Sequence, residues 1–324
     1  MNDLGRYLAI LDEIIPWSGT IPAGFTVDFL GTLTSKEFLV WGYHPAYVDG
    51  GQLSLPRPRL EDGENGEFWF EVVDWVLSVK EAREKFVMIT LGALFGYQVV
   101  GCSRALRLLN PLPSKLVAVE PIPENVQWTK RHMRDNGIDP DDHWVIQAVV
   151  SDCNDPVFFP VGSPGLGAQN CIASNEATAR QQYVDELIGG GNAEAALSNL
   201  IMNNTTGLQK DIIKGAGSSG EIKLVSAVTL ADILGPLDRV DLLEADIQQS
   251  EIIVFPPFRH LLKKKVHRIH LGTHGQDVHH SLHRMFVDDG WDVVFSYEPE
   301  SRHETELGSF ITNDGILSVR NPAV

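Results

Sequence analysis

The residues best suited to chemistry are two glycines and a carboxylate that follow consecutive apolar runs. Gly92 and Gly96 come directly after the run at 86–91, and the next run, at 115–119, ends at Glu120. Glycine permits a tight turn and a close approach of backbone to ligand, where a Cβ atom would collide. A carboxylate such as Glu120 can accept both hydroxyl hydrogens of a ribose. The glycine turn and the carboxylate together therefore indicate a nucleoside-binding site.

The glycine spacing bears on which cofactor the turn could hold. A dinucleotide site needs G-x-G-x-x-G around its pyrophosphate, and this turn has no third glycine. The pattern favours a nucleoside cofactor without phosphates over a nicotinamide dinucleotide. Two plainer alternatives stay open: the turn could bind no cofactor, and Glu120 could simply favour the dipole of a helix that begins near Pro123.

Two further polar residues follow later apolar runs. Asp246 ends the run at 240–246, and His274 comes shortly after the run at 266–271. Either side chain could take a proton from a hydroxyl substrate, so both are candidate catalytic bases. Asp246 could instead cap a helix or hold a cofactor, and His274 could make only a local hydrogen bond.

The histidines between residues 267 and 283 do not form a recognisable metal motif. His267 and His270 are expected on opposite faces of a strand, because side chains alternate along it. His279 and His283 lie one helical turn apart, but we expect them near the solvated side of their helix. No H-E-x-x-H pattern or cysteine pair supports them, so we predict no metal site.

Helical and strand patterns alternate from residue 68 onward, which predicts a doubly wound, mainly parallel α/β sheet of seven strands. The expected strands lie at 86–91, 115–120, 144–150, 240–246 and 266–271, with helices at 124–136 and 278–288 among them. The segments 291–297 and 308–319 lack a convincing helix between them. We expect them to form an antiparallel pair that closes one sheet edge.

The chain divides into an N-terminal extension at 1–67 and a main domain at 68–324. The extension carries a predicted strand pair at 25–30 and 37–41. Within the main domain, residues 160–223 are too long for an ordinary loop. We interpret them as an inserted helical cap over the active site, where an acceptor could bind.

The composition of the chain limits the kinds of partner that it is expected to bind. The chain has 324 residues, 43% of them hydrophobic, and a formal net charge of −17. So acidic a surface repels phosphate backbones and anionic lipid, which disfavours nucleic acid and membrane as partners. No apolar run reaches the roughly 18–20 residues of a membrane span, and the N-terminus lacks a signal-peptide pattern. Three cysteines without a C-x-x-C pair fit a reducing cytoplasm.

Several of these segments together resemble the FkbM-type methyltransferases. The resemblance covers about residues 70 to 300 and rests on motifs in a fixed order. They are Phe86-Val-Met-Ile-Thr-Leu-Gly-Ala-Leu-Phe-Gly-Tyr97, Leu116-Val-Ala-Val-Glu-Pro121, His132-Met-Arg-Asp-Asn-Gly137, Ala148-Val-Val-Ser-Asp152, Val228-Thr-Leu-Ala-Asp-Ile-Leu234, Arg239-Val-Asp-Leu-Leu-Glu-Ala-Asp-Ile-Gln-Gln-Ser-Glu251 and Arg268-Ile-His-Leu-Gly-Thr-His274.

The resemblance implies a class I fold, Rossmann-like, that binds S-adenosyl-L-methionine. The implied cofactor-binding residues are Thr90, Gly92, Ala93, Gly96, Glu120, Ser151 and Asp152. Ser151 and Asp152 would end the third strand near adenine, and Asp246 would stand beside the methyl donor and the acceptor. The expected reaction is O-methylation of a hydroxyl on a small molecule, such as a sugar or natural product.

Two departures from the family pattern keep alternatives open. Thr90 stands where the family usually has an acid, and Asp246-Ile-Gln-Gln-Ser-Glu251 lacks the middle acid of an Asp-x-Glu-Gly-x-Glu pattern. A catalytically degenerate protein that uses the fold only for binding is therefore one alternative. An NAD(P)-dependent oxidoreductase is the other.

Overall fold

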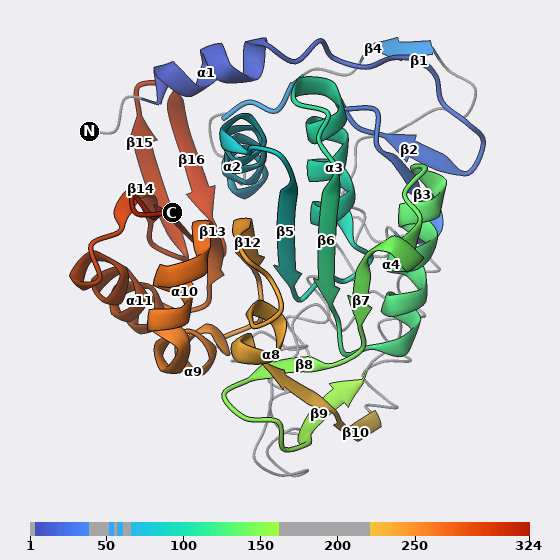
Figure 1. Cartoon of the computed structure of the whole chain (residues 1–324). Helices are drawn as coiled ribbons and strands as arrows, with labels where there is room; N and C mark the ends of the chain where they lie inside the picture. The colour runs from blue at the N-terminus through green and yellow to red at the C-terminus, as the bar shows by residue number, and fades with distance from the viewer. Residues whose placement is uncertain (1–3, 39–51, 55–56, 61–65, 162–220) are drawn as a thin grey trace, which may run out of the picture.

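The computed structural model describes residues 4–38, 52–54, 57–60, 66–161 and 221–324 (Figure 1). In the N-terminal part, β2 (Phe25–Val27) pairs antiparallel with β3 (Leu33–Ser35). The first predicted strand is present in part, but its partner is 33–35 and not the predicted 37–41. Residues Lys36–Phe38 form a 3₁₀ turn that buries Phe38, and 39–41 lie outside the described residues. The remaining N-terminal elements are α1 (Gly5–Asp12), β1 (Ser18–Thr20) and β4 (Gln52–Ser54).

The centre of the molecule is a seven-stranded sheet. Its strands are β5 (Phe86–Leu91), β6 (Ser114–Val119), β7 (Trp144–Ile146), β12 (Val240–Ala245), β13 (Val266–Thr273), β14 (Asp292–Tyr297) and β17 (Gly315–Arg320). Their order across the sheet is β14-β17-β13-β12-β5-β6-β7, and β17 alone runs antiparallel to its neighbours. Crossovers run to both sides of β5, so the sheet is doubly wound. The predicted class I methyltransferase fold is confirmed. One edge is closed by an antiparallel strand as predicted, but of the predicted segment 308–319 only the residues from 315 onward belong to the sheet.

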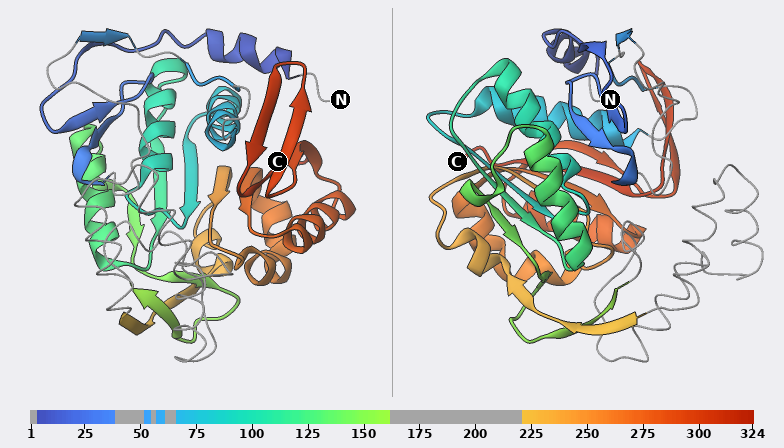
Figure 2. Two further views of the ribbon diagram at one scale, coloured as in Figure 1. Left: turned by 180° about the vertical axis from the view of Figure 1, so that it is seen from behind. Right: turned by 90° about the vertical axis from the view of Figure 1, so that its right-hand side faces the viewer.

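Helices cover both faces of this sheet (Figures 1 and 2). One face carries α2 (Glu67–Glu81) and α3 (Tyr97–Leu109), with α4 (Pro123–Asp135) beside α3. The other face carries α8 (Leu230–Leu234), α9 (Glu251–Val254), α10 (Arg259–Lys265) and α11 (Gln276–Asp288).

Strand β5 shows why the central strands read as continuous apolar runs. Phe86 and Met88 pack into the core under α2 and α3, whereas Val87 and Ile89 pack into the core on the opposite face. A strand covered on both faces has no solvated side, so apolar residues occupy successive positions.

The predicted strand at 144–150 is two strands. β7 ends at Ile146 in the central sheet, and β8 (Val149–Ser151) leaves it to pair parallel with β11 (Ala227–Thr229). Next along the chain, β9 (Val157–Val161) pairs antiparallel with β10 (Glu221–Val225). The chain therefore leaves and returns through adjacent strands around residues 162–220. The predicted cap falls almost entirely on that segment, outside the described residues.

The N-terminal helix lies beside a hairpin from the C-terminal part of the chain. The hairpin of β15 (Ser301–Thr305) and β16 (Gly308–Thr312) lies against α1 (Figures 1 and 2). The side chain of Glu306, at the hairpin tip, accepts hydrogen bonds from the backbone N–H groups of Leu4 and Gly5. The N-terminal extension is thereby fastened to the main domain.

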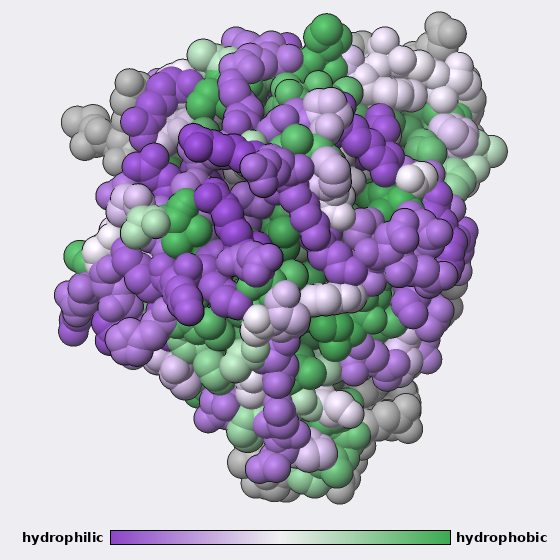
Figure 3. Space-filling model, viewed as in Figure 1, coloured by the Kyte–Doolittle hydropathy of each residue, from purple (hydrophilic) through white to green (hydrophobic). Residues whose placement is uncertain are grey.

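Hydrophilic residues cover much of the face seen in Figure 3. Among the residues that the structure describes, no helix is both long and apolar enough to cross a membrane.

Candidate functional site

The glycine-rich turn after β5 is held against the end of β6. Backbone N–H groups of Gly92 and Ala93 both donate to the Val119 carbonyl, each at 3.0 Å. The turn alternates through the left-handed region, with φ of +80° at Gly92, +49° at Leu94 and +76° at Gly96. A left-handed Leu94 is strained, and such strain is concentrated at ligand-binding turns.

Gly92 and Gly96 are required by close packing as well as by φ. A Cβ atom on Gly92 would lie 2.0 Å from the backbone oxygen of Asp246, and one on Gly96 would lie 2.7 Å from Cγ2 of Thr129. The Asp246 N–H in turn donates to the Leu91 carbonyl at 3.1 Å. The first turn and the end of β12 are therefore in direct contact, so a change in one shifts the other.

Glu120 is buried where β6 ends, and the protein itself supplies donors to both of its oxygens. Oε2 accepts from the Leu94 N–H at 2.8 Å, and Oε1 accepts from the Ile122 N–H at 2.9 Å and the Asn125 amide at 3.3 Å. Burial raises the pKa of Glu120 to about 7, although these hydrogen bonds act in the opposite direction. Oε2 keeps an acceptor site free, because each carboxylate oxygen can accept two hydrogen bonds.

A pocket opens at the carboxyl edge of the sheet, and three of the predicted residues line it: Gly92, Glu120 and Asp246. Its other lining residues are Leu94, Gln98, Val119, Pro121, Ala148, Val149, Val150, Phe159, Ile247, Gln248 and Ser250. The lining thus combines two carboxylates and two side-chain amides with apolar residues.

Five predicted cofactor residues do not line this pocket. Thr90, Ala93 and Gly96 lie in or next to the turn, and the side chains of Thr90 and Ala93 are buried. Ser151 and Asp152 are also absent from the lining, because the third sheet strand ends at Ile146 and the chain then turns into β8.

The segment before Ser151 takes the expected place instead. Ala148, Val149 and Val150 form part of the pocket wall. Ser151 is buried and donates to the exposed carboxylate of Asp152 at 3.2 Å.

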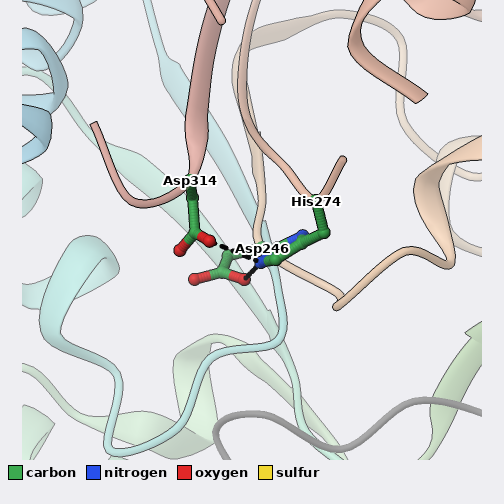
Figure 4. A group of neighbouring side chains, drawn as sticks. All are labelled: Asp246, His274 and Asp314. Carbon is green, nitrogen blue, oxygen red and sulfur yellow. Dashed lines mark ion pairs between the residues drawn. The ribbon is translucent and has the colours of Figure 1, made fainter. Parts of the chain in front are cut away.

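Asp246 and His274 end adjacent strands and face each other, as Figure 4 shows. Nε2 of His274 lies 3.3 Å from Oδ1 of Asp246 and 3.4 Å from Oδ1 of Asp314. On the other side of the ring, Nδ1 lies 3.1 Å from Oε1 of the fully buried Glu251. Three carboxylates therefore surround one imidazole.

This environment bears on the predicted role of His274 as a base. Burial alone would lower the pKa of His274, but the carboxylates of Asp246, Asp314 and Glu251 outweigh it and raise the pKa far above its ordinary value. A protonated imidazole has no lone pair with which to accept a proton, so this environment disfavours His274 as the base. Asp246 is the better candidate for that role, and its side chain is 45% exposed.

The chain turns sharply after Asp246. Gln248 and Gln249 both adopt left-handed φ values, +50° and +66°. The Gln248 amide donates to Oδ1 of Asp246 at 3.0 Å. The altered motif thus keeps a side chain that orients the strand-end carboxylate, at the cost of a strained turn.

Three of the other histidines in this region, His267, His270 and His279, have protein partners. The His267 ring lies 2.9 Å from the Glu81 carboxylate, and the His270 ring lies 2.7 Å from that of Asp74. Both carboxylates belong to α2, so the two histidines do not point to opposite faces of the strand as expected. The prediction of a solvated His279 was wrong, because its ring is buried between the hydroxyls of Thr273 and Ser296.

One curated protein and several solved structures are similar to this chain. No protein-family model matches the chain. A curated protein of Jannaschia sp. (strain CCS1), named "Putative methyltransferase", is 24% identical over 314 residues, which span 94% of this chain and 95% of that protein. This relative supports methyltransferase activity.

Solved structures give more distant likenesses. The FkbM methyltransferase of Methylobacillus flagellatus KT shares 10% identity at a TM-score of 0.40, over 81% of this chain and 56% of that one. The precorrin-6y C5,15-methyltransferase of Geobacter metallireducens GS-15 shares 12% identity at a TM-score of 0.34, over 77% and 87%. Likenesses this weak carry no functional argument, and the fold rests on the strand order described above.

Sequence reasoning missed Asp314 at this edge. The residue comes immediately before β17, and Gly315 pairs with Thr273 at the end of β13. Because β17 is antiparallel, its first residue lies where the parallel strands end. The predicted closing strand was 308–319, so Asp314 lay inside it. Only the division of that segment into two strands places Asp314 directly before the closing one.

Proposed function

We propose that this protein is an S-adenosyl-L-methionine-dependent methyltransferase of the FkbM type that methylates a hydroxyl group of a small molecule. The observation that carries the proposal is the meeting of Gly92, Glu120 and Asp246 in one pocket at the carboxyl edge of a class I sheet. In open α/β sheets this edge is where ligands bind.

The residues of the pocket fit the nucleoside part of the cofactor. Oε2 of Glu120 has a free acceptor site for a ribose hydroxyl, next to the Leu94 N–H that positions it. Val149, Val150 and Phe159 give an apolar wall of the kind that a purine ring packs against. The turn that contains Gly92 would lie beside the methionine portion.

The chain's own contribution to methyl transfer is positioning and proton removal. S-adenosyl-L-methionine supplies a methyl group on a sulfonium, which a hydroxyl oxygen accepts while the carbon–sulfur bond breaks and the hydroxyl proton leaves. Orientation of the two reactants accounts for up to about 7–11 kcal/mol of a barrier, so a weak base is sufficient. Asp246 lines the pocket and is held by Gln248 and His274, which keep its carboxylate in place for that proton.

The net charge of the chain is the reason for proposing a small, uncharged acceptor. The net charge of −17 disfavours polyanions such as nucleic acids, and a neutral sugar or natural product meets no such repulsion. The part of the acceptor site predicted in the cap lies outside the described residues.

Calorimetry with S-adenosylhomocysteine tests the proposal directly. We expect the wild-type protein to bind it in the micromolar range and Glu120→Ala to lose at least tenfold in affinity. Glu124→Ala is the matched control, since Glu124 is an exposed carboxylate four positions away and outside the pocket. Methyl transfer from labelled cofactor to a panel of hydroxylated compounds then identifies the acceptor.

The same titration separates the alternatives. Heat with NAD(P) but none with S-adenosylhomocysteine would assign an oxidoreductase. An absence of heat at millimolar S-adenosylhomocysteine, with the protein folded, would reject a functional methyltransferase site.

A further inference from the structure

One buried nitrogen at the site faces two carboxylates without making a hydrogen bond of acceptable geometry to either. The side chain of His274 is 8% exposed, and its Nε2 atom makes no hydrogen bond of acceptable geometry with any described residue. Figure 4 shows this nitrogen aimed into the space between the carboxylates of Asp246 and Asp314. Buried polar atoms are nearly always hydrogen-bonded, so an exception calls for a partner.

The distances around Nε2 are those of ligands about a common ion. It lies 3.3 Å from Asp246 and 3.4 Å from Asp314, longer than the roughly 2.7–2.9 Å of a charge-assisted hydrogen bond. Metal bonds of about 2.0–2.2 Å to nitrogen and oxygen place neighbouring ligand atoms roughly 3.0–3.4 Å apart. One ligand atom from each of the three residues lies within 4.8 Å of the other two.

The far side of the ring is already arranged for metal binding. Nδ1 of His274 lies 3.1 Å from Oε1 of Glu251, a carboxylate that is fully buried and also accepts from the Ile247 N–H at 3.0 Å. A histidine that ligates a metal almost always donates its other N–H to a carboxylate or carbonyl, which fixes the tautomer with the lone pair facing the metal. Glu251 meets that requirement.

We propose that Asp246, His274 and Asp314 bind a divalent cation, for which Mn²⁺ is the test ion, through one imidazole nitrogen and two carboxylate oxygens. Mixed imidazole and carboxylate ligands suit ions of intermediate softness, between Mg²⁺ and the thiolate-preferring metals. The cation replaces the proton on Nε2. It also offsets the negative charge gathered by Asp246, Asp314 and Glu251.

This inference deepens the proposed function and rests on it for the role of the ion, though not for its binding. Asp246 belongs both to the ion site and to the pocket lined by Gly92 and Glu120. Three protein ligands leave coordination positions open on an octahedral ion. A hydroxyl acceptor that occupies one of them becomes more acidic, which makes its oxygen a better nucleophile toward the methyl group.

The test is direct binding of Mn²⁺ to the metal-free full-length protein, with no cofactor or acceptor present. We expect one ion per chain by calorimetry, and nitrogen modulation from one imidazole in the pulsed electron paramagnetic resonance spectrum. Asp314→Asn should weaken binding at least tenfold, and His274→Gln should remove the nitrogen signal. Asp277→Asn, an exposed acid at the start of α11, is the control and should bind like wild type.

Two results would overturn the proposal: no binding at millimolar Mn²⁺, or binding that neither variant changes. Circular dichroism and thermal melts of each variant establish that it is folded, and Asp246→Asn replaces any variant that is not. Titration with S-adenosylhomocysteine is run on the same samples. Cofactor binding without Mn²⁺ binding rejects the ion site alone, whereas Mn²⁺ binding without cofactor binding rejects the methyltransferase alone.

Discussion

Oε2 of Glu120 accepts a hydrogen bond from the backbone N–H of Leu94 at 2.8 Å, which joins the end of β6 to the middle of the glycine-rich turn. Leu94 holds a left-handed conformation with φ of +49°, and this bond is one of the interactions that offset its strain. Glu120 and the glycine-rich turn, which are separate motifs in the sequence, thus form one structural unit. A ligand that binds Glu120 also meets the turn.

Cofactor affinity should depend on pH through Glu120. Burial raises the pKa of this carboxyl to about 7, and the protonated form loses an acceptor site for a ribose hydroxyl. Affinity for S-adenosylhomocysteine should therefore be about tenfold lower at pH 6 than at pH 8. Calorimetry in EDTA across this range measures it. Glu120→Gln should bind more weakly with a flat profile, and a wild-type profile that is equally flat would contradict the assignment.

The free energy of unfolding should change with pH in the opposite sense. The folded state raises the pKa of Glu120 from its ordinary value of 4.5, so ionisation of this group opposes folding. Its contribution to stability is fully present below about pH 4.5 and is lost as pH rises to about 7. Urea unfolding of wild type and Glu120→Gln at several pH values isolates this contribution. A difference between the two proteins that stays constant with pH would contradict the raised pKa.

Replacement of Gly92 by alanine should damage stability and binding together. The new Cβ atom would lie 2.0 Å from the Asp246 backbone oxygen, at a φ of +80°. Overpacking and backbone strain together cost about 2–4 kcal/mol. Gly24→Ala is a matched control, because Gly24 shares a φ of +80° but has nothing within 4 Å of the added atom. Thermal melts should show a much larger loss for Gly92→Ala, and equal losses would reject the contact as the cause.

Thr90 is a packing position in this chain, and restoring an acid there should not improve binding. Its side chain is 1% exposed, its hydroxyl has no partner among the described residues, and it pairs in register with Glu244. Burial raises the pKa of Glu244 well above its ordinary value, and Glu71 adds to the effect by repulsion. A second carboxyl beside Glu244 would therefore be costly.

We expect Thr90→Glu to destabilise the protein by about 1–3 kcal/mol without tighter cofactor binding. Thr90→Val should leave affinity within twofold of wild type and raise the melting temperature, since it removes an unsatisfied hydroxyl. Melts and calorimetry on both variants decide the matter. A large gain in affinity in Thr90→Glu would instead show that the native site has drifted from its family.

The sequence was sufficient for the sheet because burial on both faces leaves a clear pattern. Apolar runs such as 86–91 have no solvated side. The first polar residue after such a run therefore marks the end of the strand. Glu120, Asp246 and His274 were placed at the right edge for that reason.

Local pattern could not reveal where the chain leaves the sheet or which side chains meet across it. The apolar run at 144–150 continues through a change of partner from β6 to β11, so Ser151 and Asp152 were placed at the wrong strand end. Asp314 is far from His274 in sequence, and only the antiparallel β17 brings them together. The charge state of His274 depends on that meeting.

The turn after β12 offers a prediction that depends on backbone strain alone. Gln249 has a φ of +66°, in a region where a side chain costs about 1–2 kcal/mol and glycine costs almost nothing. Glycine also loses about 0.4–1 kcal/mol more entropy on folding, so Gln249→Gly should stabilise the protein by about 0.5–1 kcal/mol. Urea unfolding measures this change, and Gln249→Ala, which shortens the side chain but keeps the strain, is the control. Gln248 still donates to Asp246 in both variants, so S-adenosylhomocysteine affinity should not change. A destabilised Gln249→Gly would mean that the Gln249 side chain makes contacts worth more than the strain.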